Sequence, residues 1–334
     1  MTDRLSVRVA LLPLLLAGLM LTACRSGGRA AQTTALTPAP QAATQGIAQT
    51  APAMPKLPVT VTDKDGRSVT VSDISRIIPL NGEITEIIYA LGLGQHVVGV
   101  DISSTYPPEA RRLPSIGYQR TLAAEGILAL KPTLVIGNEN AGPPSVLEQI
   151  RTAGVTVYIM KYSPTIESVP VKIREVATAL GVPEHGEELA RTAQAEIDAA
   201  RALAARATTK PRVAFLNVRG AGTQQIWGKG TVANAMITAA GAIDAGAEAG
   251  ITGSKPITAE ALVTAQPDVI LMLTASFESA GGLDGVLAIP GIAQTPAGRN
   301  RRVVHFEDQY LFGLGPRTGR ALMDLIRALH PELQ

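Results

Sequence analysis

The segment GYQRTLAAEGILALKP, residues 117–132, gathers three side chains that can do chemistry. Tyr118 offers a phenol whose ionised form is a hard oxygen ligand for a ferric ion, and Arg120 adds a fixed positive charge two residues later. Glu125 opens a helix-like run, where the helix dipole favours a carboxylate. From spacing alone, the simpler interpretation is a loop tyrosine that caps a core beside a solvated arginine. Choosing between an iron ligand and a structural tyrosine requires the rest of the sequence.

The remaining sequence offers little for catalysis. It has no Gly-rich phosphate loop, no GxSxG motif and no HExxH motif. Its 4 histidines stand singly, without the spacing of metal ligands, and Cys24 as the sole cysteine excludes an internal disulfide. We therefore expect neither an enzyme nor a histidine-based metal site. A net charge of +2 without a basic run argues against nucleic acid as a partner.

Strand-length apolar runs alternate with helix-like stretches along the body of the chain. The runs are RIIPLN (76–81), VVGVD (97–101), TLVIGN (133–138), VTVYIM (155–160), RVAFLNV (212–218), DVILML (268–273) and RVVHF (302–306). Between them lie stretches such as EITEIIYALGLG and PPSVLEQIRTAG, the second closed by Gly154 in a C-cap position. This alternation predicts parallel βαβ units.

Two segments of the chain resemble each other. Residues 122–137 read LAAEGILALKPTLVIG, and residues 257–272 read ITAEALVTAQPDVILM. Aligned without gaps, the identical pairs are Ala124/Ala259, Glu125/Glu260 and Pro132/Pro267. We therefore predict two α/β lobes of common architecture, although α/β units also repeat similar patterns by chance.

A long Ala- and Glu-rich stretch, residues 165–208, lies between the two predicted lobes. Pro183, just after Gly181, is expected to divide it into two helices, the second running from about Glu184 to Ala207. A helical connection is stiff and limits the lobes to small relative motions.

The N-terminus has the pattern of a bacterial lipoprotein signal. Two arginines precede a short apolar run that ends in Leu-Thr-Ala-Cys, which predicts a signal peptide over residues 1–23 and a lipid on Cys24. The alternative is a plain secretory signal with a chance cysteine. Residues 24–58 are rich in Ala, Thr, Gln and Pro and are expected to form a disordered tether.

Together these features resemble the helical-backbone substrate-binding proteins of bacterial ABC importers, which handle vitamin B12, siderophores and haem. The resemblance covers the chain after Val59 and includes RIIPLNGEITEIIYALGLGQHVVGVDISSTYPPEARRLPSIGYQR. It implies an α/β fold of two doubly wound lobes joined by a long α-helical backbone. The implied boundaries are a first lobe over 59–163, a linking helix over 164–208 and a second lobe over 209–334.

Within that group the chain is most similar to the haem-binding branch. The similar strings are GYQRTLAAEGILALKP, WGKGTVANAMITAAG, GGLDGVLAIPGIAQTPAGRNRRVV and GLGPRTGRAL. The resemblance implies that Tyr118 ligates the iron of ferric haem b, the transported ligand, and that Arg120 hydrogen-bonds the ligand oxygen. A free tyrosine ionises only near pH 10, so a phenolate ligand depends on the iron and on a neighbouring guanidinium.

Other cleft contacts are expected from the same resemblance. Trp227 is expected to stack on the porphyrin, and Lys229 or Arg317 to pair with its propionates. His96 and His305 are interpreted as structural, which leaves a five-coordinate haem or one with water in the sixth place.

The resemblance also implies partners. Each lobe of such proteins offers a surface glutamate that pairs with arginines of the permease, and the matching positions here are Glu125 and Glu260. One glutamate per lobe suits docking onto a twofold-symmetric permease dimer with its ATPase. The alternative is that both are helix-start residues stabilised by the dipole. The protein itself is expected to be a monomer, anchored outside the cytoplasm through Cys24.

Three other functions remain open from the sequence. A cobalamin or iron–siderophore binding protein would keep the importer role with a different ligand. A haem relay would pass its cargo on without a transporter. An exported enzyme with a two-lobe α/β fold is disfavoured by the missing catalytic motifs.

Overall fold

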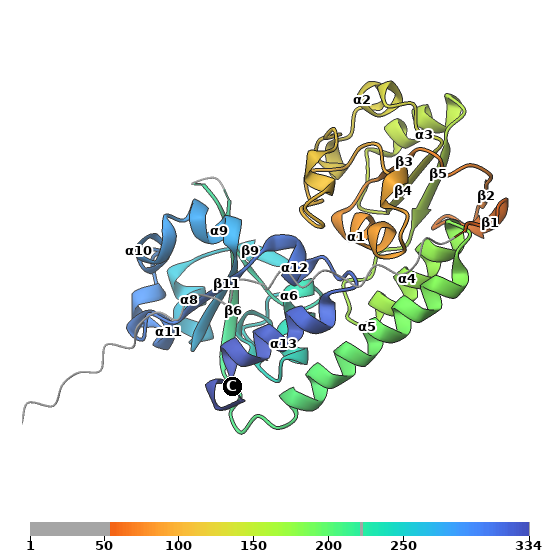
Figure 1. Ribbon diagram of the computed structural model, residues 1–334. Helices are drawn as coiled ribbons and strands as arrows, with labels where there is room; N and C mark the ends of the chain where they lie inside the picture. The colour runs from red at the N-terminus through yellow and green to blue at the C-terminus, as the bar shows by residue number, and fades with distance from the viewer. Residues whose placement is uncertain (1–53, 221–222, 334) are drawn as a thin grey trace, which may run out of the picture. The chain divides into compact units, whose positions relative to one another are not determined.

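The computed structural model describes residues 54–220 and 223–333, in which two α/β lobes are connected by helices (Figure 1). Cys24, the signal peptide and most of the expected tether lie outside the described residues. Within 54–220 and 223–333, none of the helices combines the length and apolar character that crossing a membrane requires.

The first lobe is built on a parallel sheet with the strand order β3-β4-β5. Its three strands are apolar and almost wholly buried, as expected for parallel strands covered on both faces. Gly154, with φ of +87°, directly follows the C-cap of α3, as its sequence position predicted. The elements are β1 (Val59–Thr62), β2 (Ser68–Val71), β3 (Ile77–Pro79), α1 (Gly82–Ala90), η1 (Gly94–His96), η2 (Ala110–Arg112), η3 (Gln119–Thr121), α2 (Ala124–Ala129), β4 (Leu134–Asn138), α3 (Pro144–Thr152) and β5 (Thr156–Met160).

The strand predicted over residues 97–101 does not form. Val97 makes an isolated bridge with Ile77 of β3, and Val100 makes another with Ser115. Because the segment pairs with two different neighbours within four residues, it extends neither ladder. The prediction was wrong here, although both valines are buried as an apolar run requires.

The second lobe has a mixed sheet rather than the purely parallel one expected from βαβ units. Strands β6, β10 and β11 are parallel, whereas β7 and β9 run antiparallel beside β6, giving the order β11-β10-β6-β7-β9 with β8 paired to β6. The elements are β6 (Arg212–Arg219), β7 (Thr223–Trp227), α6 (Val232–Ala239), β8 (Ile243–Asp244), α7 (Ala245–Glu248), β9 (Ser254–Pro256), α8 (Ala259–Ala265), β10 (Val269–Leu273), α9 (Thr274–Ser279), α10 (Gly282–Leu287), η4 (Ile292–Gln294), α11 (Pro296–Arg299), β11 (Val303–Phe306), α12 (Asp308–Phe312), α13 (Thr318–Leu329) and η5 (Pro331–Leu333).

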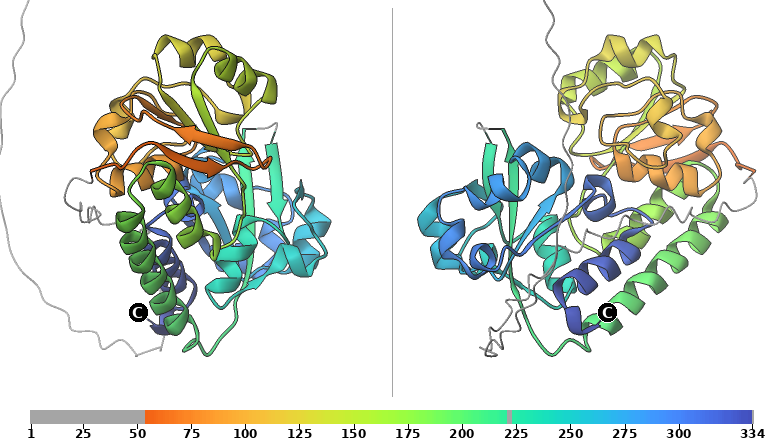
Figure 2. Two further views of the ribbon diagram at one scale, coloured as in Figure 1. Left: turned by 90° about the vertical axis from the view of Figure 1, so that its right-hand side faces the viewer. Right: turned by 60° about the vertical axis from the view of Figure 1, so that its left-hand side comes forward.

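Two helices, α4 (Ser168–Ala179) and α5 (Pro183–Ala204), connect the lobes. Pro183 is the first residue of α5, so it divides the stretch as predicted. Helix α5 packs against α4 near its N-terminal end and against α13 further along its length, as further views show (Figure 2). Gly186 of α5 contacts Ala177 of α4 so closely that a Cβ on the glycine would overlap the alanine methyl.

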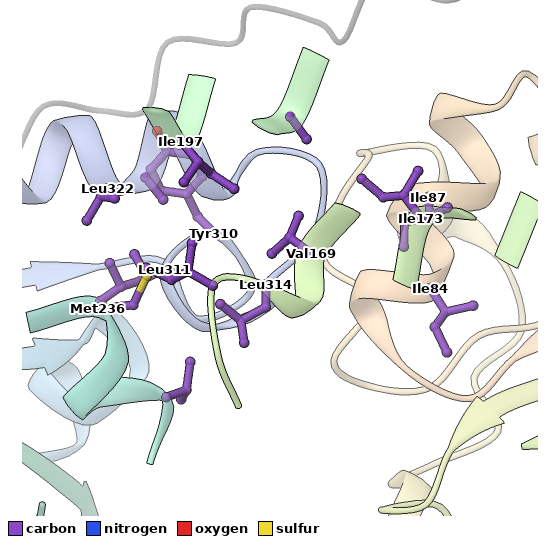
Figure 3. Packing of buried hydrophobic residues seen from close by; sticks show 14 of the residues in the cluster. Ile84, Ile87, Val169, Ile173, Ile197, Met236, Tyr310, Leu311, Leu314 and Leu322 are labelled. Atoms are coloured by element: carbon purple, nitrogen blue, oxygen red, sulfur yellow. The ribbon is translucent and has the colours of Figure 1, made fainter. Parts of the chain in front are cut away.

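One hydrophobic cluster runs through both lobes and the connecting helices. Ile84 of α1, Ile173 of α4, Ile197 of α5 and Leu322 of α13 belong to it and are almost wholly buried (Figure 3). The lobes therefore share a packed base with the helices, which opposes large hinge motions.

The ordered body begins before the predicted end of the tether at Pro58. The backbone NH of Lys56 donates to the carbonyl of Gly181 over 2.8 Å, and Leu57 packs against the shared core. The last residues assigned to the tether therefore belong to the folded part, because they contact the turn between α4 and α5.

Candidate ligand-binding site

A cavity of about 750 Å³ lies between the lobes. It is lined by residues at or just beyond the carboxyl ends of strands β3, β4, β5, β6, β10 and β11. This is the edge at which parallel α/β sheets bind their ligands. Its size suits a ligand of drug size or larger.

Tyr118 stands in the wall of this cavity with 43% of its surface exposed. It follows Gly117, whose φ of +83° is a left-handed conformation that favours glycine. The loop is held by a hydrogen bond from the backbone NH of Ile102 to the Gly117 carbonyl over 3.0 Å. Ile102 lines the same cavity with 62% of its surface exposed, so an apolar side chain lies in the wall together with the phenol.

Arg120 lines the cavity together with Tyr118. Its Nη2 atom donates to Oδ1 of Asn140 over 3.3 Å, and Asn140 is held in turn by its own NH donating to Asn138. No ion pair with Arg120 occurs among the described residues. The guanidinium is therefore positioned by a neutral amide, and its charge remains available to an anionic ligand atom.

A second phenol, that of Tyr162, also lines the cavity. Burial raises the pKa of Tyr162, the carboxylate of Glu83 raises it further, and Arg120 partly opposes both effects. Tyr162 is therefore held in its neutral form, which makes it the weaker candidate for a phenolate ligand.

The two walls of the cavity carry different charges. The first lobe contributes two arginines, Arg111 and Arg120, and one carboxylate, Glu83, which is paired with Lys172. The second lobe contributes three carboxylates and one arginine. That arginine, Arg219, is paired with Asp308 at 2.9 Å. Neither Arg111 nor Arg219 was predicted, although Arg219 ends the strand run RVAFLNV, where ligand-contacting residues are common.

Trp227 and Lys229 do not line the cavity, contrary to the prediction. Because β7 runs antiparallel to β6, it leads away from the cleft, and Trp227 pairs with Phe215 in the middle of β6. The Trp227 ring packs on Phe215 at 5.0 Å and on Phe312 at 6.0 Å between ring centroids. Lys229 lies further along and is exposed. Phe312 does line the cavity, so Trp227 reaches the site only through that ring.

Arg317 is also outside the cavity lining. It is 9% exposed, its Nε and Nη2 atoms bind both carboxylate oxygens of Glu86 at 3.0 and 2.9 Å, and its guanidinium lies 3.6 Å from the Tyr106 ring centroid. Burial raises the pKa of Glu86, while Arg317 opposes that effect. The charge of Arg317 is thus used within the protein, and its position does not support the predicted propionate contact.

The sequence of residues 77–310 matches the family model described as periplasmic binding protein. The match spans well over half of the chain. The chain belongs to the periplasmic binding protein family. The expected fold of two α/β lobes joined by a helical backbone is confirmed by this assignment and by the architecture above.

Several solved structures are similar to this periplasmic binding protein. The periplasmic haem-binding protein RhuT from Roseiflexus sp. RS-1 is 56% identical, with a TM-score of 0.76 over 78% of this chain and 100% of that one. The haem-binding protein HmuT is 39% identical, with a TM-score of 0.79 over 86% of this chain and 96% of that one.

Proteins of related sequence include a substrate-binding lipoprotein and a vitamin B12-binding protein. An ABC transporter substrate-binding lipoprotein of Bacillus subtilis is 27% identical over 284 residues, which is 82% of this chain and 86% of the relative. A vitamin B12-binding protein of Pectobacterium carotovorum is 34% identical over 122 residues, which is 36% of this chain and 44% of the relative. The match to the B12-binding protein thus spans less than half of either chain.

The two glutamates of the internal repeat occupy equivalent places in this periplasmic binding protein. Glu125 is the second residue of α2, which precedes β4, and Glu260 is the second residue of α8, which precedes β10. Both are exposed, and neither forms an ion pair within 54–220 and 223–333. One unpaired carboxylate is therefore displayed by each lobe.

No histidine in the described part of the chain lines the cavity. His305 on β11 has Nδ1 3.1 Å from the Thr274 hydroxyl, its ring stacks on Phe277 at 4.2 Å, and burial lowers its pKa. His96 ends the turn η1. Among these residues no group of three or more His, Cys, Asp or Glu side chains is arranged to hold a metal ion.

Proposed function

We propose that the protein binds ferric haem outside the cytoplasm and delivers it to an ABC-type importer. The observation that carries this proposal is the accessible phenol of Tyr118, placed with the Arg120 guanidinium in the wall of a large interlobe cavity. A phenolate is a hard anionic ligand that suits ferric iron. The 56% identity to a periplasmic haem-binding protein supports the same ligand.

In this proposal Tyr118 binds the iron through its phenol oxygen, and Arg120 donates a hydrogen bond to that oxygen. The ring of the ligand then contacts apolar side chains from both lobes, Ile102 on one side and Phe312 on the other. Burying both faces of a flat apolar ring supplies most of the driving force.

The propionates meet arginines that line the cavity rather than Lys229 or Arg317. Arg111 is exposed, and its Nε atom donates to a backbone carbonyl, that of Thr105, at 2.5 Å. Arg219 is held by Asp308 in a partly exposed pair, which costs little to rearrange. The carboxylate-rich second-lobe wall repels the anionic end of the ligand, so Arg111 is the favoured propionate contact.

Docking and anchoring complete the proposed role. Glu125 and Glu260 pair with arginines of the permease, one carboxylate from each lobe. Cys24 carries the lipid, in keeping with a relative named as a substrate-binding lipoprotein.

Cobalamin is the second candidate ligand, because vitamin B12-binding proteins are among the relatives. The fluorescence of Trp227, the single tryptophan, distinguishes the two, since its ring packs on Phe312 in the cavity wall. We expect ferric haem to quench this fluorescence saturably in the full-length chain, and cyanocobalamin at the same concentrations to quench no more than an indole standard in solution. Saturable quenching by cyanocobalamin with none by haem would replace haem with cobalamin.

A further inference from the structure

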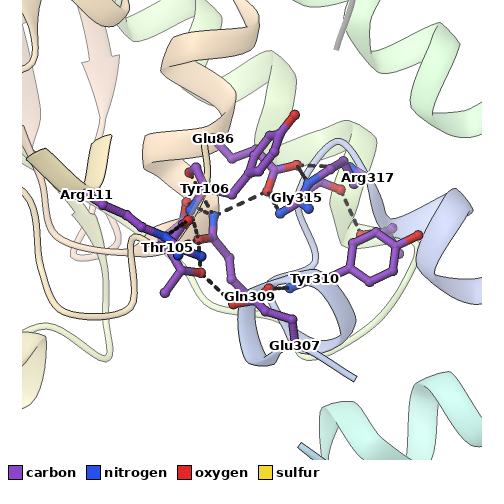
Figure 4. Close-up of polar contacts among 11 residues, drawn as sticks. Glu86, Thr105, Tyr106, Arg111, Glu307, Gln309, Tyr310, Gly315 and Arg317 are labelled. Atoms are coloured by element: carbon purple, nitrogen blue, oxygen red, sulfur yellow. Dashed lines mark hydrogen bonds and ion pairs between the residues drawn. The ribbon is translucent and has the colours of Figure 1, made fainter. Parts of the chain in front are cut away.

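Gln309, the second residue of α12, reaches from the second lobe into the first (Figure 4). Its Oε1 atom accepts from the backbone NH groups of Thr105 and Tyr106 at 2.6 and 2.8 Å and lies 2.9 Å from the Thr105 hydroxyl. Its Nε2 atom donates to the carbonyl of Gly82 at 2.7 Å, with the Tyr106 carbonyl and a Glu86 oxygen each at 3.3 Å. Every one of these partners belongs to the first lobe.

The hydrogen-bonding capacity of the Gln309 side chain is fully used by the opposite lobe. A carboxamide accepts two hydrogen bonds and donates two, and the first lobe fills all four positions. Gln309 is 7% exposed, so separating the lobes at this point exposes a buried amide and several backbone groups at once. Buried polar groups that lose their hydrogen-bond partners raise the free energy of the protein. The closed arrangement of the lobes is therefore more stable than one in which they are separated at this point.

Neighbouring contacts bring the same two segments together. The Thr105 hydroxyl lies 2.6 Å from Glu307 of the second lobe, so it can donate there when it is not bonded to Gln309. Two glycines lie at the seam. A Cβ on Gly82 would overlap the Ser103 carbonyl and lie 3.1 Å from Cδ of Gln309, and one on Gly315 would lie 3.3 Å from the Glu86 carboxyl carbon.

The seam also forms part of the cavity wall. Gly82 and Thr105 from the first lobe, and Glu307 and Gln309 from the second, all line the cavity. The separation of the lobes at this seam therefore sets how far apart the facing walls stand, including the wall that carries Tyr118.

We propose that Gln309 is a latch that sets the spacing of the lobes across the cavity and thereby the rate at which bound ligand escapes. The identification of the escaping ligand as haem rests on the proposed function, whereas the effect of Gln309 on the spacing of the lobes does not. Gln309 acts as a positioning residue, through the lobes and not on the iron. A permease that spreads the lobes must break these hydrogen bonds, so the latch also resists release before docking.

Spin labels measure the spacing directly in the full-length chain. A Cys24→Ser background removes the native thiol, and cysteines at Ser145 of α3 and Asn300 after α11, both exposed, report the distance between lobes. The test variant is Gln309→Leu, which keeps the approximate size and removes every hydrogen bond. The matched control is Gln224→Leu on β7, an exposed glutamine of the same lobe. Dissociation of ferric haem is followed in parallel by transfer to an excess of an apo-globin.

For Gln309→Leu we expect a longer and broader distance distribution without ligand and haem dissociation faster by about tenfold, since several hydrogen bonds are lost together. The absorption spectrum of bound haem should stay that of wild type, because Tyr118 and Arg120 belong to the first lobe. Gln224→Leu should match wild type in all three readouts.

Two outcomes overturn the latch: an unchanged distance with an unchanged rate, or faster dissociation at an unchanged distance, which would make Gln309 a direct ligand contact. If Gln309→Leu does not fold, Thr105→Val tests the same seam from the other lobe and should lengthen the distance as well. A wild type that fails to bind haem would overturn the proposed function, while the spin-label distances would still decide the latch.

Discussion

At the scale of single residues, Tyr118 and Tyr162 enter the same cavity from different environments. Tyr118 is exposed in the wall that also carries Arg120, whereas burial and Glu83 raise the pKa of Tyr162. The sequence string around Tyr118 was enough to predict its candidate role. The place of Arg111 in the cavity wall was not predictable, because it depends on the fold of a loop that no local pattern specifies.

Asp101 provides a prediction about pH at this scale. It is 1% exposed, and it accepts hydrogen bonds from Ser103 and Ser104. Burial, only partly offset by those hydroxyls, raises its pKa from 3.8 to about 6. A raised carboxyl pKa favours the folded state below pH 4, and this advantage is lost as the pH rises through 6. The loss amounts to about 3 kcal/mol by pH 7.

Asp101→Asn removes this titration. Urea unfolding of both proteins at pH 4, 5, 6 and 7 should show the variant gaining about 2.4 kcal/mol relative to wild type between the lowest and the highest pH, since a part of the effect is already lost at pH 4. Comparing the two proteins cancels the other titrating groups. A stability difference that stays constant with pH would show that Asp101 is not protonated in the folded state near pH 5.

At the scale of the elements, the order of strands and helices was largely predictable and the direction of one strand was not. Continuous apolar runs identified β4, β5, β6, β10 and β11, and Pro183 fixed the start of α5. Strand β7 pairs antiparallel with β6, with Arg219 opposite Thr223, and the alternation of strands and helices did not indicate this direction. An antiparallel β7 carries Trp227 and Lys229 away from the carboxyl end of β6, so neither lines the cavity.

The pair of Glu86 on α1 and Arg317 before α13 gives a prediction about how the elements are joined. Arg317→Met leaves a buried carboxylate without its partner and should lower the free energy of unfolding by about 3–5 kcal/mol. The double variant Glu86→Gln with Arg317→Met should recover most of this loss, since neither member of the pair then carries a buried charge. Chemical denaturation measures all three. Equal loss in the single and double variants would mean that the cost comes from packing and not from the charge.

At the scale of the whole molecule, one exposed glutamate on each lobe leads to a prediction about transport. Glu125→Arg combined with Glu260→Arg should reduce haem uptake at least about tenfold when the protein is reconstituted with its permease and ATPase, because like charges then face the permease arginines. Haem binding to the isolated protein should not change, since neither residue lines the cavity.

Glu188→Arg on the exposed face of α5 is the matched control and should transport like wild type. Normal uptake by the double variant would remove the two glutamates from the docking surface.

The equivalence of Glu125 and Glu260 was visible in the sequence because both begin a helix that precedes a buried strand. The cross-lobe contacts of Gln309 were not, because they join residues more than two hundred positions apart.

The most direct test of the account is the absorption spectrum of the ferric haem complex in three proteins: wild type, Tyr118→Phe and Tyr162→Phe. Both substitutions remove one phenol oxygen from the same cavity, so they differ only in the candidate ligand. We predict a tyrosinate-to-iron charge-transfer band in wild type and Tyr162→Phe, and its loss with weaker binding in Tyr118→Phe. A band that persists in Tyr118→Phe, or that disappears in Tyr162→Phe instead, would contradict the assignment of Tyr118 as the iron ligand.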